Sequence, residues 1–561
     1  MVSIAAKAPK SLNVRLKNRL DSWTFFAFFV TALIGAPIIT VIVMAFTDTS
    51  DIWQHLYNTV LGTYVQQTLL LMIGVGVGVT VIGTSTAWLV TMCRFPGSRI
   101  FEWALLLPLA VPGYVLAFVI TDQLEYAGTI QVFLRDLFGW TSARDYWFPE
   151  VRSLPSAAIV LTLVLYPYVY LLARAAFLEQ SVCALEVART LGKSSWGSFF
   201  SVALPLARPA IVVGVMLALM EVLNDFGTVD YFAVQTFTAG IFDVWLNMNS
   251  TAGAAQLSTV LLAFVLVLIV LERTARQGKK FHHTSTKYSE LPSYCLRGKR
   301  AFWAFVLCAL PVLLGFILPA SVLAHYAINF YEETLAADYF RFVANSLTLS
   351  TTAAVVAVLI GLFLAYAVRL SPTPAIKVAA RAASVGYAIP GAILAVGVLW
   401  PLGALDSMIS LLGDYAGIAI GAVMAGTIIP ILYGYLVRFL ALAYGASESS
   451  LGKVTPNMDG AARTLGATPF TALKSVHYPL MCGSLLTAGI LVFVDCMKEL
   501  PLTIILRPFN FDTLATFVYQ YASDELIEES ALGALTIVGA GIIPVILLSV
   551  TITRSRPGST S

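Results

Sequence analysis

The sequence has few charged side chains for its length. Only 12% of its 561 residues are Asp, Glu, Lys or Arg, whereas 58% are hydrophobic. A soluble globular protein carries about 25% charged residues, so this composition argues against a soluble fold. The formal net charge of +3 is too small to suggest the basic surface of a nucleic-acid-binding protein. The composition therefore predicts a membrane protein that contacts lipid and binds no nucleic acid.

The sequence also lacks the motifs of metal, redox and nucleotide chemistry. Its six cysteines are scattered and form no CxxC pair, so we infer neither a disulfide framework nor a zinc site. The segment Gly192-Lys193-Ser194 looks like the end of a phosphate loop, but Val187 stands where that motif needs glycine. No nucleophile or metal constellation suggests an intramembrane enzyme. We expect no enzyme activity and no bound cofactor.

Long hydrophobic runs are what the sequence has instead. Crossing about 30 Å of hydrocarbon takes roughly 20 apolar residues in a helix. Such runs lie near Trp23–Phe46, Thr68–Thr91, Phe101–Thr121, Ala157–Phe177, Ile211–Phe232, Gly253–Leu271, Ala301–Ala324, Leu347–Val368, Ala382–Leu402, Ala416–Val437, Cys482–Ile505 and Gly533–Val550. The first is too long for the core of a cleavable signal peptide. The sequence predicts an all-α polytopic protein with about twelve transmembrane helices.

The loops differ in their content of Lys and Arg. The segments Thr47–Gln67, Asp230–Thr251 and Gly403–Tyr415 contain neither residue, whereas the segment 273–300 is rich in both. Positive loops stay in the cytoplasm, so the basic segment lies inside and the other three lie outside. This pattern predicts a multi-pass protein of the plasma membrane with both termini in the cytoplasm.

The basic segment divides the chain into two similar units. We expect a cytoplasmic tail over 1–22, a first six-helix unit over 23–272 with its core at about 60–270, a linker over 273–300, and a second unit over 301–561 with its core at about 340–550. Each unit has an even number of spans, so the two have the same orientation and form a parallel repeat. A parallel pair of bundles encloses a central path.

A polar phrase occurs once in each unit, 274 positions apart. Ala188-Arg189-Thr190-Leu191-Gly192 is repeated as Ala462-Arg463-Thr464-Leu465-Gly466, and Pro205 is repeated as Pro479. Trp196 aligns with Phe470. Each copy lies between the fourth and fifth spans of its unit, on the cytoplasmic side. We expect a short helix that ends at the glycine in a left-handed turn, followed by a second helix. The apolar residues on this knob suggest a protein partner.

This phrase resembles the EAA loop of ABC importer permeases, and the chain looks like two such permeases fused head to tail. The resemblance implies type-1 permease repeats whose loops dock on two separate cytoplasmic ATPase subunits, which use the ATP. It also implies a binding protein outside the membrane. Glu186, Ala188 and Gly192 match the pattern, whereas the second copy has Gly460 in place of the glutamate and Asp459 one position earlier. The implied coupling residues are Glu186, Ala188, Arg189, Leu191, Gly192, Trp196, Pro205, Asp459, Ala462, Arg463, Leu465, Gly466, Phe470 and Pro479.

Acidic residues recur where the fifth and eleventh predicted spans align. Glu221 and Asp225 correspond to Asp495 and Glu499, and Lys498 is the evident base nearby. A charge in the middle of a span costs roughly 2.5–3.5 kcal/mol, so these acids are expected either to line water or to pair with bases. Four carboxylates against one ammonium leave a formal charge of about −3, by the ordinary ionisation of these groups. We interpret them as a cation path between the units, with a structural ion-pair network as the alternative.

A second resemblance concerns the transported substrate. Lys498-Glu499-Leu500-Pro501 and the stretch from Arg507 to Thr516 are similar to ferric-iron importer permeases, and Leu124-Glu125-Tyr126-Ala127-Gly128 also fits that group. Fe³⁺ prefers oxygen ligands, so transient contacts at Glu221, Asp225, Asp495 and Glu499, without a stable metal site, are chemically sensible. The resemblance implies an iron importer. Import of thiamine or a polyamine by the same architecture stays open, as does an ion-coupled secondary transporter.

Overall fold

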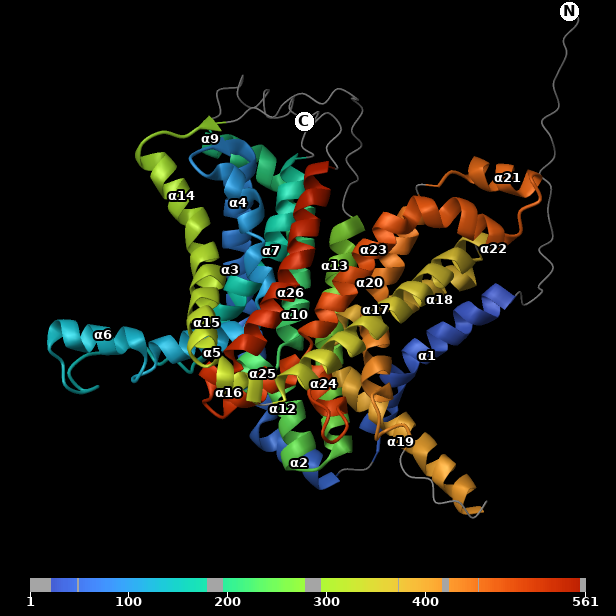
Figure 1. Ribbon diagram of the computed structural model, residues 1–561, viewed down its shortest axis with the longest axis horizontal. Coiled ribbons are helices and arrows are strands. Elements are labelled where there is room, and N and C mark those ends of the chain that lie inside the picture. The colour runs from blue at the N-terminus through green and yellow to red at the C-terminus, as the bar shows by residue number, and fades with distance from the viewer. Residues whose placement is uncertain are drawn as a thin grey trace, which may run out of the picture.

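The computed structural model describes residues 22–47, 50–178, 195–277, 294–336, 338–371, 373–415, 423–452 and 454–554. Within these ranges the chain is almost entirely helical (Figure 1). The first half contains α1 (Ser22–Ala45), α2 (Ser50–Thr59), α3 (Leu61–Met92), α4 (Ser98–Ala104), η1 (Leu107–Ala110), α5 (Gly113–Leu124), α6 (Thr129–Phe138), α7 (Leu154–Leu178), α9 (Ser195–Ser198), η2 (Phe199–Ala203), α10 (Leu204–Asn224), α11 (Gly227–Tyr231), α12 (Phe237–Phe242), η3 (Asp243–Asn247) and α13 (Thr251–Gln277).

The second half repeats this order with small changes. It contains α14 (Lys299–Val312), η4 (Leu313–Ile317), α15 (Leu318–Asn329), α16 (Tyr331–Ala336), α17 (Tyr339–Leu370), α18 (Pro374–Ala383), η5 (Gly386–Ala388), α19 (Gly391–Tyr415), α20 (Ile429–Gly452), α21 (Pro456–Thr464), α22 (Pro469–Ala472), η6 (Leu473–His477), α23 (Tyr478–Met497), α24 (Pro501–Leu506), α25 (Leu514–Ser523) and α26 (Ile527–Arg554). The strands β1 (Cys93–Arg94) and β2 (Tyr294–Cys295) pair in parallel.

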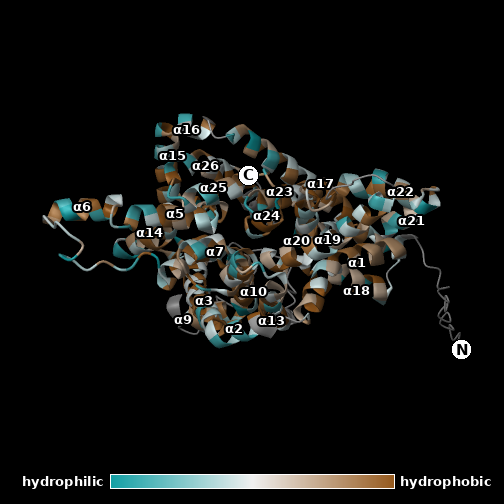
Figure 2. Cartoon of the chain, turned by 90° about the horizontal axis from the view of Figure 1, so that it is seen from below, coloured by the Kyte–Doolittle hydropathy of each residue, from teal (hydrophilic) through white to brown (hydrophobic). Residues whose placement is uncertain are grey.

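The predicted all-α membrane architecture is confirmed. Among the described residues, eleven helices are long and apolar enough to cross a bilayer, and a bent pair, Ser98–Ala110 with Gly113–Phe138, brings the total to as many as twelve. The two members of that pair meet at 90°. The break falls at Val111 and Pro112, because proline cannot donate the backbone hydrogen bond that a continuous helix needs. Viewed from the end (Figure 2), apolar brown dominates most helices, and teal marks peripheral elements such as α6 and α16.

Some predicted span boundaries are wrong. The run Ala416–Val437 was expected to span, but the helix is α20, Ile429–Gly452, which begins 13 residues later. Its second half carries polar residues on a surface that the protein buries, so hydropathy alone misplaces its end. The runs Ile211–Phe232 and Cys482–Ile505 are each broken, because α10 ends at Asn224 and α23 ends at Met497. A short helix follows each break.

The first long helix of each half packs on the other half. α1 lies against α17, α18 and α19, while α14 contacts α3 and α4 (Figure 1). Thr31 donates a hydrogen bond from its hydroxyl to the carbonyl oxygen of Ala379 at 3.0 Å, and the Phe101 and Phe305 ring centroids lie 5.3 Å apart. The two halves are therefore interlocked through their first helices, although each keeps its own bundle.

One glycine determines how closely α1 approaches α19. A Cβ atom built on Gly397 would lie 2.2 Å from the carbonyl oxygen of Pro37. That oxygen belongs to backbone and has little room to move. The contact thus requires a residue without a side chain at position 397.

We predict that Gly397→Ala separates α1 from α19 and destabilises the protein. Overpacking of this kind costs about 1–3 kcal/mol. The midpoint of thermal unfolding of the purified chain in detergent should fall. Gly403→Ala in the same helix is the matched control, because nothing lies within 4 Å of its Cβ position, and its midpoint should stay unchanged. Equal midpoints for the two variants would contradict this account of the interlock.

Candidate functional site: an acidic cavity between the halves

A cavity of about 110 Å³ lies between the two halves, and the predicted acids line it. Glu221, Asp225, Asp495, Lys498 and Glu499 all face this one space. The sequence prediction that these five residues come together is therefore met by their geometry. The volume has room for several water molecules. Charged groups from both repeats thus share a single compartment.

Two of the acids hold the starts of short helices. Asp225 accepts hydrogen bonds from the backbone N–H groups of Thr228 at 3.0 Å and Val229 at 3.1 Å. Glu499 accepts equivalent bonds from Leu502 at 3.2 Å and Thr503 at 3.1 Å. The first turn of a helix has N–H groups without intrahelical partners, and a carboxylate satisfies them. Both acids therefore lie beyond the ends of α10 and α23, and our placement of them in the middle of a span was wrong.

A glycine lies against each of these capping carboxylates. The chain reads Val111-Pro112-Gly113 in the first half and Ile389-Pro390-Gly391 in the second. A Cβ atom on Gly113 would lie 3.3 Å from Asp225 Oδ2, and one on Gly391 would lie 2.7 Å from Glu499 Oε1. In both halves, therefore, a glycine allows the backbone to approach the capping carboxylate closely.

Arg438 is a cation that the sequence analysis did not recognise as part of the site. Its Nη1 lies 2.8 Å from Glu499 Oε1, and the two side chains are only 5% and 2% exposed. We had ended the tenth span at Val437, which placed the arginine at the membrane edge rather than inside α20. A lone arginine beside an apolar run was the signal that could have revealed it. Four acids against Arg438 and Lys498 leave a formal charge of −2, not −3.

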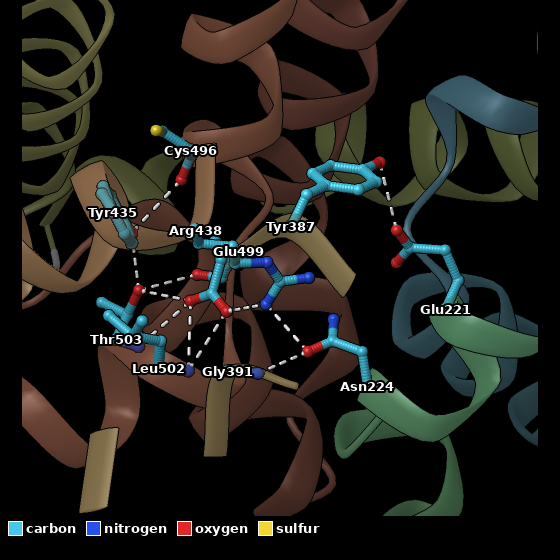
Figure 3. Close-up of polar contacts among 10 residues, drawn as sticks. All are labelled: Glu221, Asn224, Tyr387, Gly391, Tyr435, Arg438, Cys496, Glu499, Leu502 and Thr503. Atoms are coloured by element: carbon cyan, nitrogen blue, oxygen red, sulfur yellow. Dashed lines mark hydrogen bonds and ion pairs between the residues drawn. The ribbon is translucent and has the colours of Figure 1, made fainter. Parts of the chain in front are cut away.

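The remaining two acids differ in their partners. Asp495 Oδ1 lies 2.9 Å from Lys498 Nζ, three residues further along the chain. Glu221 accepts a long hydrogen bond of 3.3 Å from the Tyr387 hydroxyl and, in the part of the chain that the structure describes, has no ion-pair partner (Figure 3). Glu221 is therefore the carboxylate most available to a cation in the cavity.

The cluster also crosses from one half to the other. Asn224 Oδ1 accepts hydrogen bonds from the Gly391 backbone N–H at 2.7 Å and from Arg438 Nη1 at 2.8 Å. Figure 3 shows the Asn224 amide at the end of α10, directed at Arg438 and at the start of α19. The ion-pair network that was the alternative interpretation is present at Asp495 and Glu499, and the cation path stays a prediction. Over the described ranges, no group of three or more His, Cys, Asp or Glu side chains is arranged to hold a metal ion.

The two repeated phrases differ in how much of them the structure describes. Glu186, Ala188, Arg189, Leu191 and Gly192 of the first copy lie outside the described residues. Downstream of them, Trp196 belongs to α9 and Pro205 to the first turn of α10. In Figure 1, α9 and the second-copy helices α21 and α22 lie at the same end of the molecule, opposite α2 and α16.

The second copy forms the helix–turn–helix that the sequence predicts. α21 ends at Thr464, and Gly466 adopts a φ of 78°. The N–H of Ala467 bonds to the Ala462 carbonyl and that of Gly466 bonds to the Arg463 carbonyl, both at 3.0 Å. These two bonds define a Schellman turn. Leu465 at the turn is 88% exposed and Phe470 in α22 is 61% exposed, whereas Pro479 lies in the first turn of α23.

Asp459 connects this element to the bundle. Its Oδ2 accepts a hydrogen bond from Arg369 Nε at 2.9 Å, and its Oδ1 lies 2.7 Å from His477 Nε2. Arg369 also donates to the carbonyl oxygens of Leu451 and Val454 at 2.6 and 2.9 Å. Burial raises the pKa of Asp459, but the hydrogen bonds from His477 and Arg369 outweigh it and hold that pKa below its ordinary value. Asp459 therefore positions α21 rather than offering a free charge.

Comparison with known proteins agrees with this architecture. The model of the family "binding-protein-dependent transport system inner membrane component" matches residues 79–276. The molybdenum transport system permease protein ModB of Escherichia coli is 30% identical over 205 residues, which cover 35% of this chain and 86% of that protein. The chain belongs to this permease family. It is a multi-pass inner-membrane permease subunit of a binding-protein-dependent ABC importer.

Two further relatives of this permease extend over both halves. The Fe(3+)-transport system permease protein FbpB 2 of Haemophilus influenzae is 26% identical over 93% of this chain and 98% of its own length. The ferric transport system permease protein FbpB of Actinobacillus pleuropneumoniae is 22% identical over 80% of this chain and 65% of its own. The alignment with FbpB 2 thus spans both halves of the permease over nearly the full length of both chains.

We predict that Asp459→Asn loosens α21 from the permease bundle. Hydrogen bonds to charged groups contribute about 1.5–3 kcal/mol each, and the variant loses the charge that two of them share. Hydrogen exchange of the amides in 456–464 should be faster, while exchange in α25 should stay the same. Because the folded-state pKa is lowered, this stabilisation is present above the ordinary Asp pKa near 3.9 and is lost as pH falls through the folded value. Unchanged exchange in the variant would contradict the positioning role.

Proposed function

We propose that this permease imports ferric iron across the plasma membrane. The observation that carries the substrate assignment is the relative named for Fe(3+) transport, which aligns over nearly the full length of both chains. The cavity supports it chemically, because Fe³⁺ is a hard cation that prefers oxygen ligands and the cluster has a net negative formal charge. Glu221 and Asp495 are the first contacts of the cation in transit. Asp225 and Glu499 shape the cavity by holding the helix starts.

A second candidate substrate comes from the shorter relatives. ModB of Escherichia coli is a molybdenum transport permease, and the sulfate transport permease CysW of Synechocystis is 28% identical over 36% of this chain. These alignments each cover little more than a third of the chain. A cavity with four carboxylates repels an oxyanion by the same electrostatics that attract a cation. We therefore favour the cation over an oxyanion, and over thiamine or a polyamine on the strength of the full-length relatives.

The energy for transport comes from other polypeptides. We propose that two cytoplasmic ATPase subunits hydrolyse ATP, that one docks on each repeated phrase, and that an iron-binding protein delivers the cation from outside. The end of the molecule with α9, α21 and α22 then faces the cytoplasm (Figure 1). We propose from the distribution of Lys and Arg that both termini lie on the same side. The exposed Leu465 and Phe470 offer the apolar contact surface that such docking needs. This chain itself binds no ATP and no resident cofactor.

We predict that Glu221→Gln lowers iron uptake by about tenfold, because the variant removes the carboxylate charge from a cation contact. Uptake of radiolabelled Fe³⁺ is measured in cells that lack the native permease and express either form at equal membrane levels. Glu332→Gln, at an exposed acid in α16, is the control and should transport normally.

Two results would oppose this proposal at different points. Normal uptake by Glu221→Gln would remove Glu221 from the path. Normal iron uptake in cells without the permease, together with failed thiamine or polyamine uptake, would overturn the substrate.

We predict that Leu465→Asp weakens ATPase binding without affecting membrane insertion. The leucine is 88% exposed at the Schellman turn, so a charge there costs the permease fold little but is unfavourable in an apolar interface. Copurification of the ATPase subunits should fall by about tenfold, as the loss of one well-buried leucine at an interface implies. Leu526→Asp, at an exposed leucine just before α26, is the control for a non-specific effect. Full ATPase recovery with Leu465→Asp would count against docking at this turn.

A further inference from the structure

Two hydrogen bonds to Asn224 connect the two halves at the cavity. One oxygen atom, Asn224 Oδ1, accepts from the Gly391 N–H at 2.7 Å and from Arg438 Nη1 at 2.8 Å, and both donors belong to the second half. The same Nη1 also donates to Glu499 Oε1 at 2.8 Å. The Arg438 and Glu499 side chains are almost completely buried, and bonds to a charged donor are strongest where water is excluded.

We propose that Asn224, Arg438 and Gly391 form a tie that holds the halves together and must break once in each transport cycle. The inference rests on the proposed function, in which ATP-driven movement of the halves opens the path. When the halves part, Arg438 remains with Glu499 in its own half, and of the bonds that Arg438 Nη1 makes only the one to Asn224 is lost. The tie therefore opens without leaving a buried charge unpaired. An unpaired buried charge would cost far more free energy than the loss of a hydrogen bond to an amide.

The internal repeat offers no second, equivalent tie. Asn224 aligns with Lys498, and Arg438 aligns with Val164, at the spacing of 274. A lysine has no acceptor, so it cannot replace Asn224 opposite an arginine. In the second half Lys498 instead pairs with Asp495, within its own chain segment. The second half has no amide at the position equivalent to Asn224. We therefore infer that Asn224 serves the contact between the halves and is not part of the architecture that both repeats share.

One donor of the Arg438 guanidinium is unsatisfied in the arrangement that the structure describes. Its Nε is buried and has no hydrogen-bond partner in the described structure. A buried donor without an acceptor is unfavourable. If the guanidinium rotates so that Nε donates to water in the opened cavity, this new bond compensates in part for the lost bonds to Asn224. Glu221 and Asp495 line that same cavity. The tie thus sits beside the acids that the cation is proposed to contact.

The test measures ATP hydrolysis by the purified permease assembled with its ATPase subunits, without binding protein and without iron. Asn224→Ala removes the acceptor from the first half. Gly391→Ala acts from the other half, because its Cβ would lie 2.7 Å from Glu499 Oε1 and 2.8 Å from Arg438 Nη1 and so displaces the guanidinium. Each variant should raise basal hydrolysis by about tenfold, the shift expected from losing a bond to a charged group. The double variant should rise no further than either single one, because both break the same tie.

Two matched controls distinguish the tie from general loosening. Tyr435→Phe removes a buried hydrogen bond of 2.6 Å to Thr503 within the second half. Gly83→Ala, in α3, crowds the Val169 side chain and the Tyr170 backbone within the first half, among residues that do not line the cavity. Neither should raise basal hydrolysis. An equal rise in the controls, an unchanged rate in both tie variants, or additive effects in the double variant would overturn the proposal.

Other outcomes are also decisive. If one tie variant does not assemble, the other carries the test; if neither assembles while both controls do, the contact is a requirement for folding and the proposal is overturned. The readout involves no substrate, so an error in the assignment of iron leaves it valid. Failure of the wild-type assembly to hydrolyse any ATP would instead contradict the proposed function.

Discussion

A carboxylate buried in an apolar bundle needs a hydrogen-bond donor or a cation, and this requirement organises the centre of the permease. Asp225 and Glu499 satisfy it with the free N–H groups of the short helices that follow them. Asp495 uses Lys498, and Glu499 has Arg438 in addition. The breaks after α10 and α23 exist because these acids stabilise the start of a new helix. The same breaks open a cavity in which Glu221 has no cationic partner among the described residues.

Features that both halves share and features that only one half has contribute differently to this centre. Features common to both halves, such as the Pro-Gly breaks and the capping acids, build a symmetric frame around the cavity. Features of one half alone, above all Arg438 and Asn224, act across the interface. The repeated phrases differ in sequence as well, because Asp459, which is bound by Arg369 and His477, aligns with Leu185 in the first copy. A fused chain can specialise its halves in this way, whereas a homodimer of one permease unit could not.

Hydropathy and the internal repeat were enough to predict the all-α membrane fold, the left-handed turn at Gly466 and a cluster of the five charged residues. They failed where polar residues are buried. The arginine at position 438 reads as a membrane edge because an apolar run stops there, yet α20 continues to Gly452. The bonds of Asn224 could not be predicted either, because they depend on how closely Gly391 approaches from a distant part of the chain. Interlocking of α1 and α14 with the opposite halves likewise follows from packing rather than from any single segment.

The central claim is that the interface between the halves is the transport path and that the ATPases open it. Its most direct test is the distance between Asn224 Oδ1 and Arg438 Nη1 in the assembled transporter, determined without nucleotide and with a non-hydrolysable ATP analogue. We expect a hydrogen bond near the present 2.8 Å without nucleotide. With the analogue we expect a separation beyond about 3.5 Å, too long for a hydrogen bond. An intact bond in both states, with the cavity still closed between the halves, would contradict the account.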